Sequence, residues 1–186
     1  MSKVISLLTA LVILNTLCYS QDYLSFDEED ITFEIRDSTF IVEGLYYFNS
    51  GTPKQYPILY PFPIDSIFGI PSDIAVKYIN TGETIQYKMK KDASAIIFSA
   101  SIHGKTPIMI SYHQRLKANK ARYILLTTRY WRKPLKQVNY KLITKPDFTV
   151  KRFWERPDKE IELDNKKMYL WQKVDFMPTY DFEIEY

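Results

Sequence analysis

Hydrophobic and polar positions alternate along this chain in short runs, which is typical of β-strands. In residues 31–36, Ile31, Phe33 and Ile35 share one face and polar side chains occupy the other. Residues 39–48 are apolar on both faces, which indicates an interior strand, and Gly44 within it predicts a bulge or a close approach of the backbone. The sequence Asn-Ser-Gly-Thr-Pro at 49–53 predicts the turn that ends this strand.

The middle of the chain predicts further strands in pairs. Three prolines in residues 56–63 indicate an edge strand or an extended crossing, because proline donates no backbone hydrogen bond. Residues 64–72 are expected to form a loop or a single helical turn. One hairpin is predicted over residues 73–90 with its turn at 80–82, and another over residues 95–113 with a turn around Gly104.

The clearest local pattern lies in residues 122–144, where two runs rich in β-branched and aromatic residues flank Trp131-Arg132-Lys133-Pro134. This pattern predicts a hairpin or a sharp strand-to-strand corner. The apolar run at 124–126 indicates a strand at the centre of a sheet, whereas the corner is expected to face outward. Additional strands are predicted at 148–153, 167–173 and 181–186, with a charged linker at 155–160.

About ten short strands at this spacing predict an all-β fold, an antiparallel β-sandwich. No segment of twelve or more residues has convincing helical periodicity. The length of 186 residues favours one domain, which we place at residues 31–186. Aromatic residues make up 16% of the chain, and such side chains favour the half-buried surfaces of sheets.

The N-terminus predicts export from the cytoplasm. Residues 1–20 combine Lys3, an apolar run at 4–14 and the small residue Ser20 at a plausible cleavage point, as in a secretory signal peptide. An uncleaved anchor is the alternative, and lipid attachment at Cys18 is disfavoured because Leu17 precedes it. We expect a secreted or periplasmic protein with no transmembrane segment after cleavage, and a flexible acidic lead at residues 21–30.

The residues that usually perform catalysis or bind metal are scarce. Cys18 is the only cysteine and would leave with the signal peptide, so no disulfide or thiolate is expected in the mature chain. His103 and His113 are predicted to lie apart, which argues against a metal site. No nucleophile, zinc or phosphate-binding motif occurs, so we expect no cofactor and no enzymatic activity. The formal charge of +3 and the predicted export argue against nucleic acid as a partner.

One candidate binding site combines cations with aromatic rings. It consists of Arg129, Tyr130, Trp131, Arg132 and Lys133. Such residues bind anionic polymers through charge and stacking, and exposed rings in a row could equally form a platform for carbohydrate. In the alternative interpretation, the tryptophan is a packing anchor and the cations keep sheet edges from pairing with other chains.

A resemblance adds to this interpretation. The segments at 42–49 (VEGLYYFN), 60–63 (YPFP) and 123–131 (YILLTTRYW), followed by Pro134-Leu135, resemble a broad group of uncharacterised exported bacterial β-sandwich proteins. The resemblance covers nearly the whole mature chain and consists of packing and turn residues. It implies an immunoglobulin-like sandwich and supplies no functional residues.

Three hypotheses for function follow. The first is an exported, non-enzymatic domain that contacts proteins or has a structural role in the cell envelope or outside the cell. The second is a binding module for glycans or anionic envelope polymers, with its site at residues 129–133. The third is a hydrolase whose carboxylates converge only in the fold.

Overall fold

The computed structural model describes residues 23–186, and within them the chain is all-β, as the sequence predicts. These residues form eleven strands and one short 3-10 helix. The predicted signal peptide at residues 1–20 lies outside the described residues. No helix among residues 23–186 is long and apolar enough to cross a membrane.

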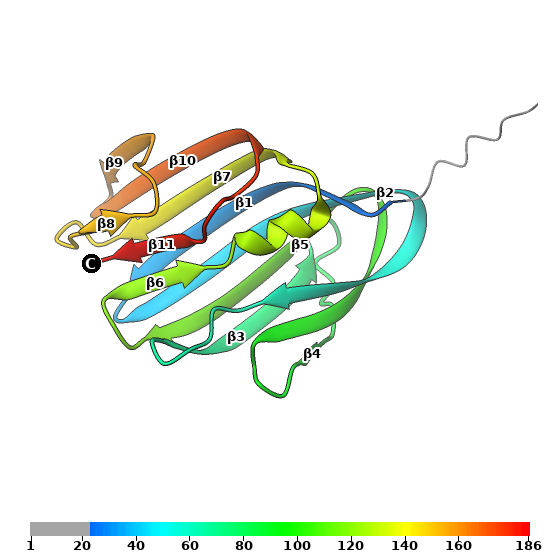
Figure 1. Cartoon of the computed structure of the whole chain (residues 1–186), viewed down its shortest axis with the longest axis horizontal. Coiled ribbons are helices and arrows are strands. Elements are labelled where there is room, and N and C mark those ends of the chain that lie inside the picture. Colours follow the sequence, from blue (N-terminus) through cyan, green and yellow to red (C-terminus); the bar gives the residue numbers. More distant parts are fainter. Residues whose placement is uncertain (1–22) are drawn as a thin grey trace, which may run out of the picture.

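The strands form two sheets (Figure 1). The large sheet has the order β3-β5-β2-β1-β7-β10-β9, with β4 also paired to β5. Its strands are β1 (Ser25–Arg36), β2 (Thr39–Pro61), β3 (Phe68–Tyr78), β4 (Tyr87–Met89), β5 (Ala95–Leu116), β7 (Leu135–Thr144), β9 (Lys159–Leu163) and β10 (Lys166–Phe176). The small sheet has the order β6-β11-β8 and consists of β6 (Lys120–Tyr123), β8 (Arg152–Phe153) and β11 (Phe182–Glu185).

The large sheet is mixed, which corrects the prediction of a purely antiparallel fold. β1 pairs with β7 in parallel, while β1 and β2 form an antiparallel hairpin. The chain leaves β2, completes β3 to β6, and returns to the far side of β1 through the 3-10 helix η1 (Leu126–Trp131). A return of this kind fixes the direction of β7 without any local signal in the sequence.

The longest elements, β2 and β5, run side by side and bend together. Ser50 pairs with Gly104 and Lys54 pairs with Ile102, so three residues of β2 lie opposite one residue of β5. The predicted turn at 49–53 and the predicted turn at Gly104, which has φ of +57°, therefore face each other as one bulge inside two continuous strands. The second predicted hairpin, over 95–113, was wrong for this reason. After the bend β2 pairs only with β5 among the described strands, which confirms the predicted edge position of the prolines.

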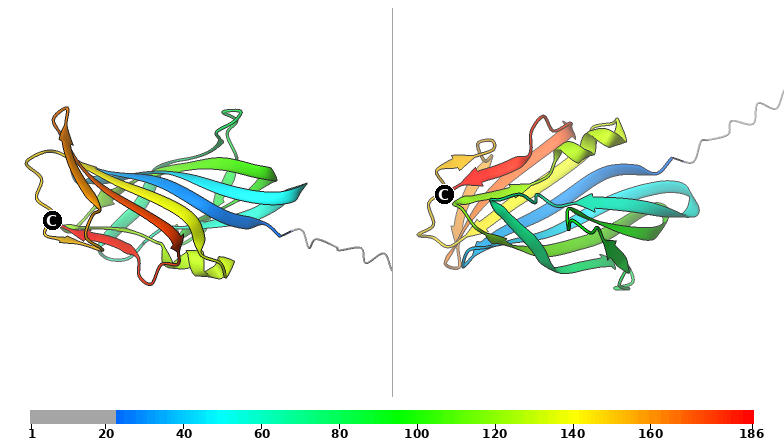
Figure 2. Two further views of the ribbon diagram at one scale, coloured as in Figure 1. Left: turned by 90° about the horizontal axis from the view of Figure 1, so that it is seen from above. Right: turned by 60° about the horizontal axis from the view of Figure 1, so that its bottom comes forward.

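The two layers share one apolar core. The Phe33 ring on β1 lies 4.2 Å from Phe182 on β11 and 5.3 Å from Tyr123 on β6, measured between ring centroids. Past the bend, the Phe62 ring lies 4.9 Å from that of Tyr112 on β5, a residue that pairs with Val42 in the part of β2 before the bend. Two layers of strands thus meet face to face, and Figure 2 shows β11 and η1 on one side of the curved large sheet. The opposite face of the large sheet is called the outer face below.

The hairpin predicted over residues 122–144 was also wrong. Its first half forms β6, an edge strand of the small sheet, and its second half forms β7 inside the large sheet. Residues 124–126, predicted to lie at a sheet centre, lead into η1 instead. Asp181 caps this helix, because its Oδ1 accepts hydrogen bonds from the backbone N–H of Leu125 and Leu126, at 3.0 Å each. The corner connects two sheets, so its flanking strands do not pair with each other.

Other predictions were partly confirmed. The turn at 80–82 forms, with Gly82 at φ +73°, and the segment after it bonds to β3 through the Lys77–Thr84 bridge and the Ile85 N–H donated to Val76 O. The returning strand β4 itself pairs with β5. Of the strand predicted at 148–153, only Arg152–Phe153 is formed. The linker predicted at 155–160 ends inside β9.

Candidate functional site

The predicted basic and aromatic corner lies at the surface. Tyr130 is 85% exposed, and Arg129, Arg132 and Lys133 are exposed as well. Arg132 ends η1 in the left-handed conformation, with φ of +57°. The corner therefore faces outward, as its sequence predicts, and its binding role stays a prediction.

Trp131 is directed toward the core rather than outward with its neighbours. Its ring centroid lies 5.7 Å from that of Phe26 and 5.9 Å from that of Phe48. Tyr46 and Tyr60 are buried, so they do not join Tyr130 in a row on the surface. The aromatic platform that would suit a carbohydrate is therefore not formed at this corner.

The acidic segment predicted as a flexible lead at 21–30 is largely structured, since residues 25–30 form the first half of β1. Asp27 forms a bulge in the pairing with β2. Beyond the bulge the inward positions of β1 are Glu29, Ile31 and Phe33. Glu29 thus places a carboxyl group on the buried face of β1, a strand that pairs with β2 on one side and with β7 on the other.

Glu29 is 2% exposed and accepts a short hydrogen bond from the Tyr140 hydroxyl. Burial raises the pKa of Glu29 from 4.5 to about 7, because the charged form loses its hydration. The Tyr140 hydrogen bond acts in the opposite direction on this pKa, and the negative charge of the neighbouring Asp30 raises it further. No cation among residues 23–186 forms an ion pair with Glu29.

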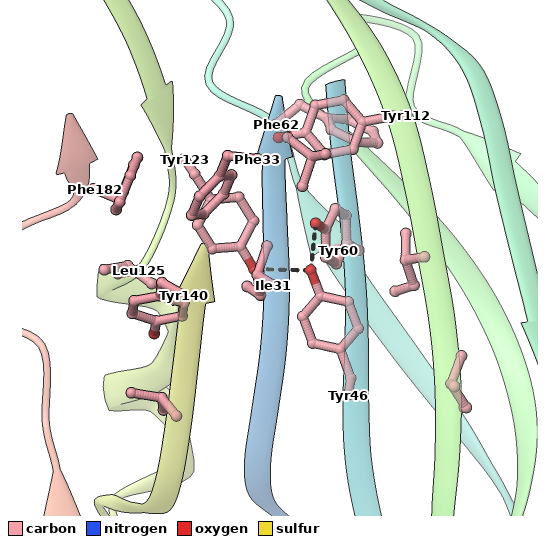
Figure 3. Close-up of a cluster of buried hydrophobic side chains, with 14 of the residues drawn as sticks. Ile31, Phe33, Tyr46, Tyr60, Phe62, Tyr112, Tyr123, Leu125, Tyr140 and Phe182 are labelled. Atoms are coloured by element: carbon pink, nitrogen blue, oxygen red, sulfur yellow. Dashed lines mark hydrogen bonds between the residues drawn. The ribbon is translucent and has the colours of Figure 1, made fainter. Parts of the chain in front are cut away.

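Three tyrosines form a hydrogen-bonded cluster (Figure 3), and they line the same cavity as Glu29. The Tyr46 hydroxyl lies 2.7 Å from that of Tyr60 and 2.9 Å from that of Tyr123. Burial raises the pKa of all three phenols well above 10, so they stay protonated. Gly44 permits this arrangement, because a Cβ there would lie 2.4 Å from the Tyr46 hydroxyl oxygen. The close approach predicted at Gly44 is thus made by a side chain.

Glu29, the tyrosine cluster and Trp131 line one cavity of about 60 Å³. The cavity lies between β1, both halves of β2 and the segment that includes η1. Four residues of its lining have access to solvent: Leu59, Ile124, Thr127 and Trp131. Of the binding site predicted at residues 129–133, only Trp131 lines this cavity.

Sequence reasoning missed Glu29, although a signal existed. The alternation of Ile35, Phe33 and Ile31 extends two residues back to Glu29, which places a carboxylate on the buried face. The cluster of four consecutive acids hid this pattern.

A larger groove, of about 480 Å³, crosses the outer face over β2, β1, β7 and β10. Its apolar floor includes Leu45 and Leu170, both half-buried. Charged and amide side chains surround the floor: Asp30, Glu43, Asn139, Lys141, Asp158, Lys159 and Gln172. This volume lies within the range of about 300–1,000 Å³ that is usual for ligand sites.

Several charges in this groove have no charged partner. Glu43, Lys141 and Lys159 make no ion pair with any residue in the described range of 23–186. Asp30, in contrast, is engaged, because it accepts hydrogen bonds from Tyr47 at 3.0 Å and from Asn139 at 2.5 Å. The groove therefore offers both signs of charge to a partner.

The charges on the small sheet differ in this respect. A groove of about 570 Å³ there contains Arg122 and Arg152. Arg122 Nη2 lies 2.7 Å from Glu183, and Arg152 Nη2 lies 2.6 Å from Glu185. These cations are neutralised within the chain, so this surface is less suited to bind an anion.

The described residues contain no cluster of three or more side chains that could hold a metal ion. His113 Nδ1 lies 3.1 Å from Asp73 Oδ2, on the outer face near the end of β5. His103 occupies the bulge of β5, ten residues earlier. The two histidines do not share a site.

The comparisons with known proteins give little beyond this geometry. No protein-family model and no curated protein matches the sequence. Among solved structures, the chain is similar to native leukotriene A4 hydrolase from Saccharomyces cerevisiae, with a TM-score of 0.49 and 11% identity over 88% of this chain and 29% of that chain. A second structure, of native yeast LTA4 hydrolase, gives a TM-score of 0.47 and 9% identity over 87% and 28%. The chain spans less than a third of these structures, and we draw no functional conclusion from the likeness.

Proposed function

We propose that this chain is an exported, non-enzymatic binding domain that contacts a protein partner through the groove on its outer face. The observation that carries the proposal is the set of unpaired charges in that groove, Glu43, Lys141 and Lys159. Some exposed charges elsewhere on the chain are paired, such as Lys105 with Glu28 at 2.7 Å. Charges of both signs left without a partner above an apolar floor suit a partner of complementary charge.

A polypeptide fits this groove better than the alternative ligands, a glycan or an anionic polymer. The groove presents no exposed aromatic ring for a sugar to stack on, since Trp171 in its lining is 1% exposed. An anionic polymer would meet Asp158 and Glu43 as well as the lysines. Main-chain amides and mixed side-chain charges of a protein can satisfy both sets of groups.

Export rests on the sequence of residues 1–20, and the partner is therefore expected in the cell envelope or outside the cell. The test is affinity capture from the secreted and envelope fractions of the source organism with three forms of the protein. These are the wild type, Lys141→Glu combined with Lys159→Glu, and a control with Lys88→Glu combined with Lys90→Glu. Lys88 and Lys90 are exposed and lie outside the groove.

We expect the same proteins to be enriched by the wild type and the control, and to be lost on the groove variant. Equal enrichment by all three forms, or repeated failure to enrich any protein, would overturn the proposal. Binding of the wild type to a glycan array, lost with Trp131→Ala, would instead support the alternative site at residues 129–133.

The hydrolase hypothesis is disfavoured by the state of one carboxylate. Asp30, Glu43 and Asp158 do line the same groove, so carboxylates converge in the fold. Asp30 accepts hydrogen bonds from Tyr47 and Asn139, so one of the three carboxylates is already engaged within the chain. Hydrolysis of glycan substrates that is lost with Glu43→Gln would contradict the non-enzymatic assignment.

A further inference from the structure

The cavity beside Glu29 combines a buried acid with aromatic walls. Its volume is about 60 Å³, and a water molecule occupies about 30 Å³ in the liquid, so it accommodates groups of one or two heavy atoms. Six aromatic rings line it: Phe26, Tyr46, Phe48, Tyr60, Tyr123 and Trp131. Phenylalanine and tryptophan rings cannot neutralise a carboxylate or hydrate it.

Glu29 lacks the partner that a buried carboxylate needs. Its described hydrogen bond comes from the Tyr140 hydroxyl, and no Lys or Arg in residues 23–186 pairs with it. A buried charge without a counterion costs several kcal/mol by typical estimates. A ligand cation in the adjacent cavity would supply the missing charge.

We infer that this cavity binds a small organic ammonium cation, of the size of methylammonium, between the Glu29 carboxylate and the surrounding rings. The faces of aromatic rings attract organic cations, which is the basis of the aromatic cages that recognise alkylated ammonium groups. The carboxylate adds a full opposite charge at one side. The inorganic cations Na⁺ and K⁺ prefer a shell of oxygen ligands. The hydroxyls of Tyr46, Tyr60 and Tyr123 bond one another, and the Phe26, Phe48 and Trp131 rings offer no oxygen.

Part of the cavity lining has access to solvent. Leu59 is 53% exposed, and Ile124, Thr127 and Trp131 are half-buried. The Trp131 ring is half-buried and packs against the Phe26 and Phe48 rings. A ligand would enter beside the tryptophan, whose fluorescence should report its arrival.

Binding should compete with a proton at Glu29. The titratable groups that face this acid are Tyr140 on β7, Tyr46 and Tyr60 on β2, and Tyr123 on β6, with Asp30 next to it on β1. The phenols stay neutral near pH 7, because burial raises the pKa of each well above its usual range. Since the pKa of Glu29 is about 7, the carboxylate is the group that changes charge between pH 5.5 and 8.

The test is a titration of the purified protein with methylammonium chloride, with NaCl exchanged so that ionic strength stays constant. Saturable binding is measured by calorimetry and by the rise in melting temperature. We expect binding at pH 8 and affinity about thirtyfold lower at pH 5.5, where about 3% of the acid would be ionised for a pKa near 7. Glu29→Gln should abolish binding, whereas the matched control Glu28→Gln, at a half-buried position paired with Lys105, should retain it.

Three outcomes would overturn the inference. One is the absence of saturable binding by the wild type at pH 8. The second is equal binding by Glu29→Gln, which would place the ligand elsewhere. The third is an equal effect of KCl, which would show that charge alone, and not the aromatic walls, determines what binds. The groove variant with Lys141→Glu and Lys159→Glu should bind methylammonium normally, so this test is independent of the proposed protein partner.

Discussion

Glu29 is a residue whose position costs stability at neutral pH, and this cost is measurable. Its folded pKa of about 7 exceeds the usual 4.5, so the folded state holds this proton more tightly than the unfolded state. The protonated form of Glu29 favours folding. This contribution to the free energy of unfolding is complete below pH 4.5 and is lost as the pH rises to about 7. The total loss is about 3 kcal/mol, at 1.4 kcal/mol per unit of pKa shift.

Replacement of this acid by its neutral isostere should remove that dependence. We expect Glu29→Gln to be more stable than the wild type by about 1–3 kcal/mol at pH 8, and the difference to shrink toward pH 5. Urea unfolding at several pH values measures it. Other carboxylates, such as Asp65 and Asp92, have lowered pKa values and act in the opposite sense, but they are common to both proteins. A difference that does not change with pH would show that Glu29 is charged throughout.

Gly44 is a second residue with a specific role, since the Tyr46 ring lies over it. A Cβ at this position would lie 2.4–2.6 Å from three atoms of that ring. The ring is buried and hydrogen-bonded to Tyr60 and Tyr123, so it cannot move without cost. We expect Gly44→Ala to lower the free energy of unfolding by about 1–3 kcal/mol. In a Tyr46→Ala background the same substitution should cost much less, and equal costs in both backgrounds would contradict this explanation.

Among the elements, the sequence predicted strands well and connections poorly. Alternation located the second half of β1, at residues 31–36, because one face of it is buried by the core. The strands predicted at 167–173 and 181–186 match β10 and β11 to within three residues at each end. The residues at 49–53 and at Gly104 have ordinary turn chemistry, and only long-range pairing decides that they form a bulge between two continuous strands. The corner at residues 131–134 likewise joins two sheets, which no local pattern distinguishes from a hairpin.

The candidate sites were harder to predict for the same reason. The exposed corner at residues 129–133 could be recognised from its composition, but the inward direction of Trp131 depends on contacts with Phe26 and Phe48, which are distant in sequence. The groove on the outer face combines residues from five strands and therefore has no sequence motif. Glu29 alone could have been found, by extending the alternation of β1 past the acidic cluster.

The 3-10 helix η1 depends on a single acid from another part of the chain. Asp181 accepts hydrogen bonds from the backbone N–H of Leu125 and of Leu126. Asp181→Ala leaves both donors without this acceptor, and we expect a loss of about 1–2 kcal/mol in stability. Hydrogen exchange in residues 125–131 should accelerate, and Trp131 fluorescence should change. Asp181→Asn keeps one oxygen acceptor and serves as the matched control. Equal exchange rates in both variants would mean that η1 is held by packing alone.

At the level of the whole molecule, the small sheet cannot be stable by itself. Its strands contain two to four residues each, and its buried side chains pack on the large sheet. Phe182 of β11 shows this: its ring centroid lies 4.2 Å from that of Phe33 and 5.5 Å from that of Trp171, both on the large sheet. The two sheets should therefore unfold together, in a single cooperative transition.

Phe182→Ala tests this coupling. Because the ring is fully buried between the layers, its removal should lower the free energy of unfolding by about 3–5 kcal/mol. Far-UV circular dichroism reports all strands, and tryptophan fluorescence reports Trp154 and Trp171, which contact the Phe182 ring. Both signals should shift to lower urea by the same amount, whereas Val174→Ala, at a side chain that is 72% exposed, should stay within about 0.5 kcal/mol of the wild type. If fluorescence changed at lower urea than circular dichroism, the small sheet would be separating first, and the two layers would not form one cooperative unit.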